Sequence, residues 1–299
     1  MHIRMGTRGS ALALAQCKEV RDRLQEAYPQ HTFELCVIST KGDRNQHVAL
    51  DQMKDKGIFV KEIEQQLLEG TIDLAVHSMK DMPSTLDARL CFTKTLLRED
   101  ARDVLVLRTA PTLEQLPPHA RIATGSKRRS YQLLRQRNDL EIVGIRGNIE
   151  TRLRKLEEQP LDGIVLAAAG LKRLKLKPYI TQPLKECVMV PAVAQGALAI
   201  EVCKEREDLI QLVNALCDPA LDEEVCAERA FLQELNGGCH TPLGARCILH
   251  DTTAELYAVY GNEDGTRLKQ LHVSGAREQA VELAIQAAAV LREQVGGKQ

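Results

Sequence analysis

The 299-residue sequence contains no tryptophan, and its aromatic residues together make up only 3% of the chain. Platforms on which nucleic-acid bases stack are therefore not expected. The formal net charge is −1, so the chain lacks the overall positive field that attracts nucleic acid or an anionic membrane. Any site for an anion must therefore be a local cluster of arginine and lysine.

The sequence also lacks the signals of secretion, disulfide bonding and zinc binding. No apolar run approaches the roughly 20 residues of a membrane span. The first ten residues, MHIRMGTRGS, contain no apolar core of a signal peptide. The nine cysteines are an odd number, and no two of them form a C-x-x-C pair. We expect a reduced, cytoplasmic protein without a bound metal.

The pattern that is present predicts alternating strands and helices. Ser10 is a good N-cap for a helix over 11–28, and strands are expected at 2–7 and 32–39 on either side of it. A strand at 72–76 runs into the charged loop that contains Lys80 and Asp81. Strand, helix, strand is the start of an α/β domain, and ligands of such sheets bind at the carboxyl ends of the strands.

Three domains follow from the rest of the pattern. Residues 89–97 and 191–202 are expected to be strands that link the first two domains. The segment 100–190 alternates like a second α/β domain, and the C-terminal part predicts three antiparallel strands and a long helix. The boundaries that we expect are 1–98 with 192–216, then 99–191, then 217–299.

The turn Asn236-Gly237-Gly238-Cys239-His240 presents one thiol after a predicted helix over 221–235. Gly237 is well placed as the C-cap of that helix. Cys239 can be a spare thiol at a turn, or it can be a nucleophile or a covalent attachment point. Adjacent residues rarely have the geometry of a nucleophile and its base, so a Cys239–His240 pair is not favoured.

Two predicted helices begin with cations where acidic residues are the usual choice. Lys127, Arg128 and Arg129 follow the N-cap Ser126, and they oppose the positive end of the helix dipole. Arg146 and Arg152 flank the next cap, Asn148. One such helix start is usually a solvated basic edge, but two at successive strand ends favour a site for an anion with several charges.

The same combination of cation and hydroxyl occurs in the first domain, at Arg8 and Ser10, and Arg173 follows the strand predicted at 162–166. Asp81 is the only acid of its loop, and the alternatives are a solvated ion pair with Lys80 or a catalytic carboxylate. Thr124-Gly125-Ser126-Lys127 lacks the full phosphate-loop pattern, so a nucleotide site is not expected.

Several long motifs resemble those of the porphobilinogen deaminase (hydroxymethylbilane synthase) family, and they occur in the family's order from Arg4 to the end of the chain. They are GTRGSALALAQ (6–16), KGIFVKEIE (56–64), DLAVHSMKDMP (73–83), TGSKRRSYQL (124–133), IRGNIETRLRKL (145–156), LAAAGLKRL (166–174), PAVAQGALAIE (191–201) and NGGCHTPLGA (236–245). Position 194 is alanine where the family commonly has glycine.

The resemblance implies a fold and a reaction. The fold is α/β, with two lobes that resemble the type II periplasmic-binding-protein fold around a central cleft, and a third, small α+β domain. The reaction joins four porphobilinogen molecules head to tail with loss of ammonia, and hydrolysis then releases 1-hydroxymethylbilane for haem biosynthesis. The growing chain is held on a dipyrromethane cofactor, and by position Cys239 looks like its thioether anchor. The family further implies a cytoplasmic monomer.

The resemblance also implies roles for single residues. Asp81 resembles the catalytic acid, which stabilises the azafulvenium left by loss of ammonia and manages protons. The residues that match positions for the cofactor are Ser78, Lys80, Thr124, Ser126, Arg128, Arg129, Arg146, Gly147 and Arg152. Those that match positions for substrate or the growing chain are Arg8, Ser10, Phe59 and Arg173. Phe59 follows a polar segment, 40–56, which is expected to be a long mobile loop, either a functional lid or simple disorder.

Two rival functions fit part of the sequence. A two-lobed binding protein for a small anion would account for the arginines, but not for the third domain or the Cys239 turn. A hydrolase with Cys239 as nucleophile would need a separate histidine and acid, and no recognisable motif supplies them.

Overall fold

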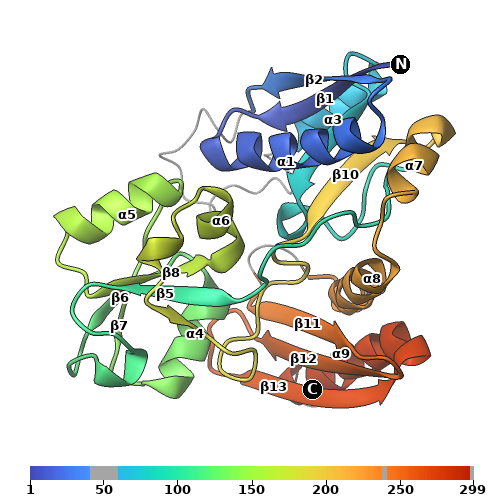
Figure 1. Ribbon diagram of the computed structural model, residues 1–299. Helices are drawn as coiled ribbons and strands as arrows, with labels where there is room; N and C mark the ends of the chain where they lie inside the picture. Colours follow the sequence, from blue (N-terminus) through green and yellow to red (C-terminus); the bar gives the residue numbers. More distant parts are fainter. Residues whose placement is uncertain (41–59, 238–240, 297–299) are drawn as a thin grey trace. The chain divides into compact units, whose positions relative to one another are not determined.

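The computed structural model describes residues 1–40, 60–237 and 241–296, and the chain divides into two compact units. Unit 1 comprises Met1–Arg98 and Ala197–Asp222, and unit 2 comprises Glu99–Gly196 and Glu223–Gln299. Figure 1 labels helices and strands of both units.

Unit 1 is built on a five-stranded sheet of order β2-β1-β3-β10-β4. The strands are β1 (His2–Arg8), β2 (Thr32–Ile38), β3 (Leu74–Ser78), β4 (Leu90–Phe92) and β10 (Leu198–Cys203). β1, β2 and β3 are parallel, whereas β10 is antiparallel to both of its neighbours. Figure 1 shows β10, from late in the chain, between strands from its first third.

Helices cover both faces of this sheet. α1 (Ala11–Ala27) buries Cys17, Val20 and Leu24 in a core shared with β1, β3, β10 and α7 (Glu207–Asn214). α3 (Lys61–Leu68) buries Ile63 and Leu67 on the other face. This face contains alternate residues of the central strands, as the period of two in a strand requires.

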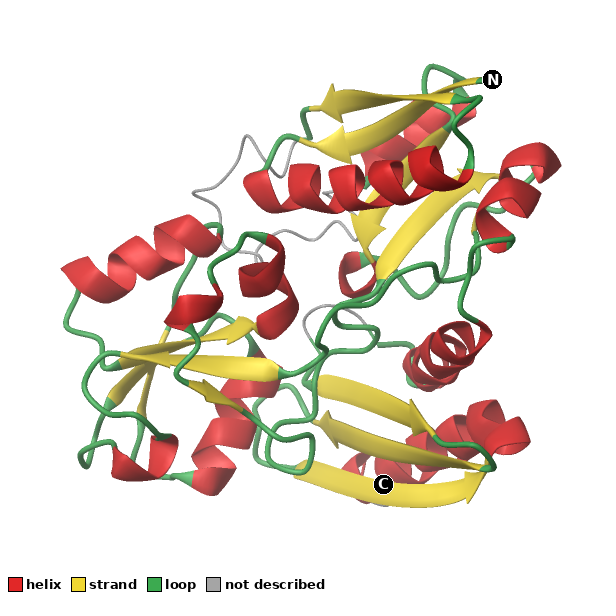
Figure 2. Ribbon diagram, viewed as in Figure 1, coloured by secondary structure: helices red, strands yellow, loops and turns green. Residues whose placement is uncertain are grey.

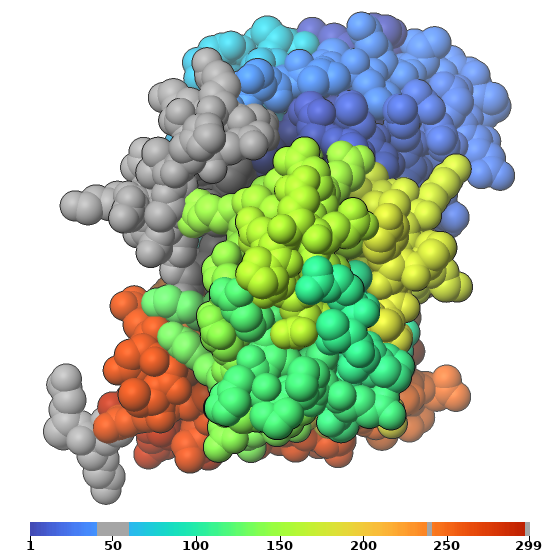
Figure 3. Space-filling model, turned by 90° about the vertical axis from the view of Figure 1, so that its left-hand side faces the viewer, coloured from blue at the N-terminus to red at the C-terminus, as the bar shows by residue number. Residues whose placement is uncertain are grey.

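The first sheet of unit 2 has the order β7-β6-β8-β5-β9 and repeats the arrangement of unit 1. Its strands are β5 (Asp103–Leu107), β6 (Arg121–Ala123), β7 (Glu141–Val143), β8 (Gly163–Ala167) and β9 (Gln182–Pro183). Its helices are α4 (Lys127–Gln136), α5 (Ile149–Glu158) and α6 (Ala168–Arg173). In the face that Figure 3 shows, the green and yellow-green residues of this part of the chain pack directly against one another.

The second sheet of unit 2 is antiparallel and has the order β11-β12-β13. Its strands are β11 (Leu243–Leu249), β12 (Thr253–Gly261) and β13 (Leu268–Ala276). α9 (Ala280–Gly296) packs small side chains against β12 and β13, which lets the helix approach the sheet closely (Figure 2). α8 (Pro219–Glu234) precedes this sheet in the chain. Single 3-10 turns lie at Met79–Asp81, Leu113–Gln115, Lys177–Tyr179 and Arg277–Gln279.

The predicted fold class is confirmed, with two similar α/β sheets and a separate antiparallel α+β part. Two predicted strands are wrong in extent, because only Leu90–Phe92 of 89–97 and Leu198–Cys203 of 191–202 are strand. The predicted C-cap at Gly237 is also wrong, because Asn236 takes the left-handed conformation with φ 47°. Gly237 follows it and donates its N–H to Leu232 O at 3.2 Å, which ends the helix in a Schellman-like turn.

No helix among the described residues is long and apolar enough to cross a membrane.

Candidate functional site

A pocket in unit 1 lies where β1 and β3 end. These strands are parallel neighbours, so their carboxyl ends, at Arg8 and Ser78, meet at one edge of the sheet. Ser10 caps α1 by accepting a hydrogen bond from Ala13 N at 3.3 Å. The 3-10 turn after β3 presents Asp81, whose side chain is exposed. Arg8, Ser10, Ser78 and Asp81 line one cavity of about 90 Å³.

Gln16 belongs to this pocket and was not predicted. Its side chain is 5% exposed and donates from Nε2 to Ser78 Oγ at 2.8 Å. The glutamine lies on α1, two turns after the capped start of the helix. No signal in the sequence distinguishes it from other glutamines, because its partner is 62 positions away.

The carboxyl ends of β6, β7 and β8 form a second candidate region, in unit 2. β6 is parallel to both of its neighbours, so the segments after the three strands lie along one edge. Ser126 caps α4 by accepting from Arg129 N at 3.5 Å, and Asn148 caps α5 by accepting from Thr151 N at 2.8 Å. Thr124 accepts a hydrogen bond from Ser126 N at 3.2 Å, which tightens the turn into α4.

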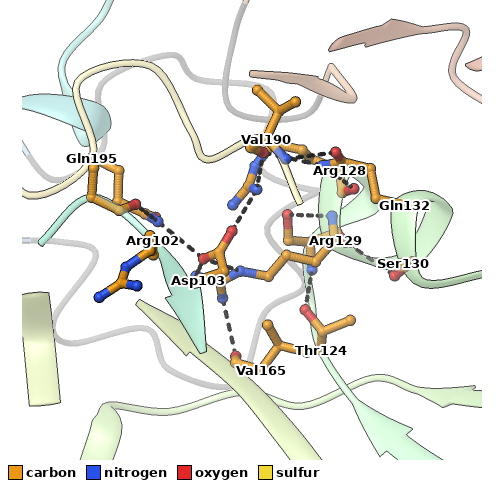
Figure 4. Close-up of polar contacts among 12 residues, drawn as sticks. Arg102, Asp103, Thr124, Arg128, Arg129, Ser130, Gln132, Val165, Val190 and Gln195 are labelled. Carbon is orange, nitrogen blue, oxygen red and sulfur yellow. Dashed lines mark hydrogen bonds and ion pairs between the residues drawn. The ribbon is translucent and has the colours of Figure 1, made fainter. Parts of the chain in front are cut away.

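Arg128 and Arg129 are buried and converge on a carboxylate that was not predicted, Asp103 (Figure 4). Arg128 Nη1 donates to Asp103 Oδ2 at 2.6 Å, and Arg129 donates to Oδ1 from Nε at 3.0 Å and from Nη2 at 2.7 Å. Gln195 Nε2 donates to the same oxygen, Oδ1, at 3.0 Å. Arg128 and Arg129, at the start of α4, therefore have a compensating anion within the protein.

The electrostatics of Asp103 follow from this arrangement. Burial alone would raise the pKa of the Asp103 carboxyl, but the two guanidinium groups hold that pKa well below its usual value. The sequence does not single out this acid, because Asp103 is the first residue of β5 and lies 25 positions before Arg128. The only feature of the sequence that could have indicated Asp103 is its charge at the start of an otherwise apolar strand.

Backbone carbonyls orient Arg128 and Arg129 further. Arg128 Nη1 also donates to Val190 O at 2.6 Å, and Arg129 Nη1 donates to Val165 O at 3.1 Å. Gly244, near the start of β11, lies against this group, because a Cβ on it would be 3.0 Å from Arg128 Cδ. Gly244, four residues after the segment 238–240, is therefore beside Arg128.

Arg146, Gly147 and Arg152 surround the start of α5. Gly147 has φ 112°, which a residue with a side chain rarely adopts, and its carbonyl accepts from Arg152 Nε at 2.8 Å. Lys155 Nζ donates to Arg146 O at 3.1 Å. Arg146 and Arg152 are half-buried, and Arg173 is half-buried at the end of α6.

The structure thus gathers the predicted residues in two groups, one in each unit. Unit 1 holds Arg8, Ser10, Ser78, Lys80 and Asp81, although Lys80 does not line the cavity. The other group comprises Thr124, Ser126, Arg128, Arg129, Arg146, Gly147, Arg152 and Arg173. Cys239, Phe59 and the predicted lid, apart from Thr40, lie outside the described residues.

The donor set fits a ligand with several carboxylates. Guanidinium groups, capped helix starts and serine hydroxyls are the groups that bind carboxylate oxygens. Within 1–40, 60–237 and 241–296, no group of three or more His, Cys, Asp or Glu side chains could hold a metal ion.

The two family models that match this chain describe two domains of the same family. Residues 3–211 match the family model of the porphobilinogen deaminase dipyrromethane cofactor binding domain, and 223–293 match that of the porphobilinogen deaminase C-terminal domain. Porphobilinogen deaminase of Clostridium novyi is 47% identical, with 99% of this chain and 100% of the relative covered. That of Clostridioides difficile is 49% identical over 95% of this chain and 96% of the relative.

Among solved structures, the methionine-binding protein MetQ is similar, with a TM-score of 0.47 and 12% identity over 76% of this chain and 94% of that chain. A likeness of this size carries no conclusion about fold or function.

Proposed function

Because the chain belongs to the porphobilinogen deaminase family, we propose that Asp81 is its catalytic acid and that its clustered arginines bind carboxylates of cofactor and substrate. The activity itself follows from the family. The chain is a transferase that condenses four porphobilinogen molecules with loss of ammonia and yields 1-hydroxymethylbilane, a precursor of haem, and its cofactor is dipyrromethane. The alternative of a binding protein without catalysis is not favoured.

The observation that supports the role of Asp81 is the unit 1 pocket. An exposed carboxylate shares this cavity with the Arg8 guanidinium and the Ser10 and Ser78 hydroxyls. As ammonia leaves porphobilinogen, positive charge develops on the pyrrole, and a nearby carboxylate stabilises that charge. The same carboxylate can accept and return protons at the pyrrole nitrogen. Arg8 and Ser10, together with Arg173, then bind the acetate and propionate groups of the substrate, and Phe59 matches the position that closes over the site in the family.

For the cofactor we propose the unit 2 group, with Cys239 as the thioether anchor and Ser78 and Lys80 as further contacts. When bound, dipyrromethane supplies the pyrrole to which the first substrate is joined. Arg128, Arg129 and the start of α4 are favourable for its carboxylates, since these groups are rigidly held before any ligand arrives. The contact of Gly244 with Arg128 supports this proposal, because it brings the residues that follow the Cys239 turn next to the arginines.

The test of Asp81 is its replacement by alanine, with Asp87→Ala as the matched control. Asp87 is a nearby exposed acid that pairs with Arg89 on the surface. Asp81→Ala should abolish formation of hydroxymethylbilane and leave the thermal midpoint unchanged, whereas Asp87→Ala should retain the parent rate. A normal rate of bilane formation in Asp81→Ala would refute the assignment. If the parent protein shows no turnover and Asp81→Ala only changes its affinity for porphobilinogen, the binding-protein alternative is favoured.

The test of Cys239 is the intact mass of the denatured protein beside Cys239→Ser. The parent should be heavier than its sequence by one dipyrromethane, and the variant should not. A parent of sequence mass that gains nothing on incubation with porphobilinogen would refute the anchor. If the parent loads itself but the variant loads equally, the cofactor is attached elsewhere.

We further propose a cytoplasmic monomer with three domains, 1–98 with 192–216, 99–191 and 217–299. The division near residue 217 is supported by the gap between the two family matches, at 212–222. Sedimentation velocity tests the monomer, because a mass near 33.3 kDa is expected at every concentration. Limited proteolysis tests the domains, because the first cuts should fall near the boundaries.

A further inference from the structure

A buried histidine–glutamate pair in unit 1 has no part in the function described so far. His77 Nε2 and Glu201 Oε2 are 3.1 Å apart, and the two side chains are 6% and 0% exposed. Both lie on the face of the sheet that α3 covers, since His77 pairs with Ala199 and Glu201 with Ala75 in the β3–β10 ladder. The alanines beside the pair leave room for the larger side chains.

The buried surroundings of Glu201 disfavour an ionised carboxylate that has no cation beside it. Its Oε1 has no hydrogen-bond partner among the residues that the structure describes, and a buried carboxylate without a cation beside it is strongly disfavoured. Burial raises the pKa of the facing Glu64 on α3, and the negative charge of Glu201 raises it further, while His77 lowers it. Lys61, Asp87 and the thiols of Cys91 and Cys203 are the other titratable groups in this neighbourhood.

The pair lies directly beside the turn that carries Asp81. His77 lines the same cavity as Ser78 and Asp81, and it is the last buried residue of β3 before the 3-10 turn. The turn is tied to β10 as well, because Met79 N donates to Ala197 O at 3.0 Å, one residue before that strand begins. The contact between β3 and β10 therefore fixes where the turn begins.

We propose that His77 and Glu201 are positioning residues that hold one proton between them, with His77 as the cation, and thereby fix the turn of Asp81 for reaction. A pair with one shared proton is electrically neutral, so Asp81 remains the only negative charge among the described residues that line the cavity. The inference rests on the proposed role of Asp81, but the protonation of His77 does not depend on that role.

The experiment compares His77→Gln, Glu201→Gln and the double variant as holoenzymes. Each single variant should lower kcat about 10- to 100-fold and leave KM within about twofold, because the turn is displaced while substrate binding is retained. The double variant should be no slower than the slower single variant, because one interaction is lost in each case. His2→Gln is the matched control, since His2 forms an exposed pair with Glu34 at 2.9 Å in the same sheet, and it should keep the parent kcat.

A second readout is independent of activity. Nitrogen-15 NMR of histidine-labelled parent enzyme should show both ring nitrogens of His77 protonated at the pH of the activity assay, and Glu201→Gln should show a neutral ring at the same pH. A neutral His77 in the parent, or a parent kcat in both single variants, would overturn the proposal. So would additive losses of kcat in the double variant. If Asp81→Ala retains activity while the His77 signals behave as expected, the assignment of Asp81 fails and the shared proton stands.

Discussion

Replacing Asp103 by asparagine should destabilise unit 2 strongly. The carboxylate accepts from Arg128 Nη1 at 2.6 Å and from Arg129 Nη2 at 2.7 Å, with all three side chains buried. Asparagine removes the charge and turns one NH2 group toward an arginine, so two buried cations lose their counter-ion. Breaking a buried pair in this way costs about 3–5 kcal/mol. For a body of this size the thermal midpoint should fall by about 6–20 °C.

The pH dependence of this loss has a definite sign. The pKa of Asp103 is lowered in the folded state, so its contribution to stability is complete above the unfolded pKa of about 3.9 and is lost as the pH falls toward the folded value. The difference between parent and variant should therefore be constant from pH 8 to 5 and should shrink only below about pH 4.

Urea unfolding followed by far-ultraviolet circular dichroism suits this protein, which has no tryptophan. Asp87→Asn is the control, because that carboxylate pairs with Arg89 in solvent and its removal should leave the midpoint unchanged. A loss below about 1 kcal/mol for Asp103→Asn at pH 7, within the range of a surface pair, would refute the reasoning.

Three further outcomes are expected. Ala194→Gly should stabilise the protein by about 0.5–1 kcal/mol in urea unfolding, because Ala194 has φ 55° and glycine adopts this conformation without strain; an unchanged or lower midpoint would contradict this. Gly196→Ala should cost about 3 kcal/mol or more in the same assay, because a Cβ there would be 2.1 Å from Glu99 O and φ is 88°; a neutral result would show that the backbone can move aside. Burial raises the pKa of the Cys17 thiol to about 12, so iodoacetamide at pH 8 should modify the exposed Cys187 and spare Cys17, as peptide mass mapping would show; equal labelling would be inconsistent with the buried site.

Local patterns in the sequence were sufficient for most of the fold. The capped helices after Ser10, Ser126 and Asn148 begin where the caps predict, because a side-chain oxygen must satisfy the free N–H groups at each start. The three strands of the antiparallel sheet also follow from their alternation.

The two wrong strand extents have a common cause, which is hydrogen bonding to distant side chains. Lys94 N donates to Asn214 Oδ1 at 2.8 Å and Thr95 N to Asp222 Oδ1 at 2.7 Å, so this segment has no need of a neighbouring strand. Ala194 N likewise donates to Glu228 Oε2 at 2.7 Å. These partners are 34 to 127 positions away in the chain, so no periodic pattern in the sequence indicates them.

The sequence predicts the cations of the candidate site, but it does not predict the side chains that pair with them. Arg128 and Arg129 stand out because they contradict a rule for helix starts, whereas Asp103 and Gln195 occupy positions that contradict none. Which arginine meets which acid is decided by tertiary packing. The roles of the site residues toward cofactor and substrate stay predictions.

β10 is synthesised long after its neighbours in the sheet, β3 and β4, and this order has a consequence for folding on the ribosome. β4 pairs only with β10 within the described sheet, yet it precedes residue 198 by more than one hundred positions. At the usual 5–20 residues per second, synthesis of the 120 positions from Ser78 to Leu198 takes about 6–24 s, and during that time the edge of β3 has no partner. The strands β5–β9 of the other sheet are consecutive in the chain and leave the ribosome before β10. During that interval the nascent chain exposes an apolar strand edge, and this is the moment at which a chaperone would benefit it most.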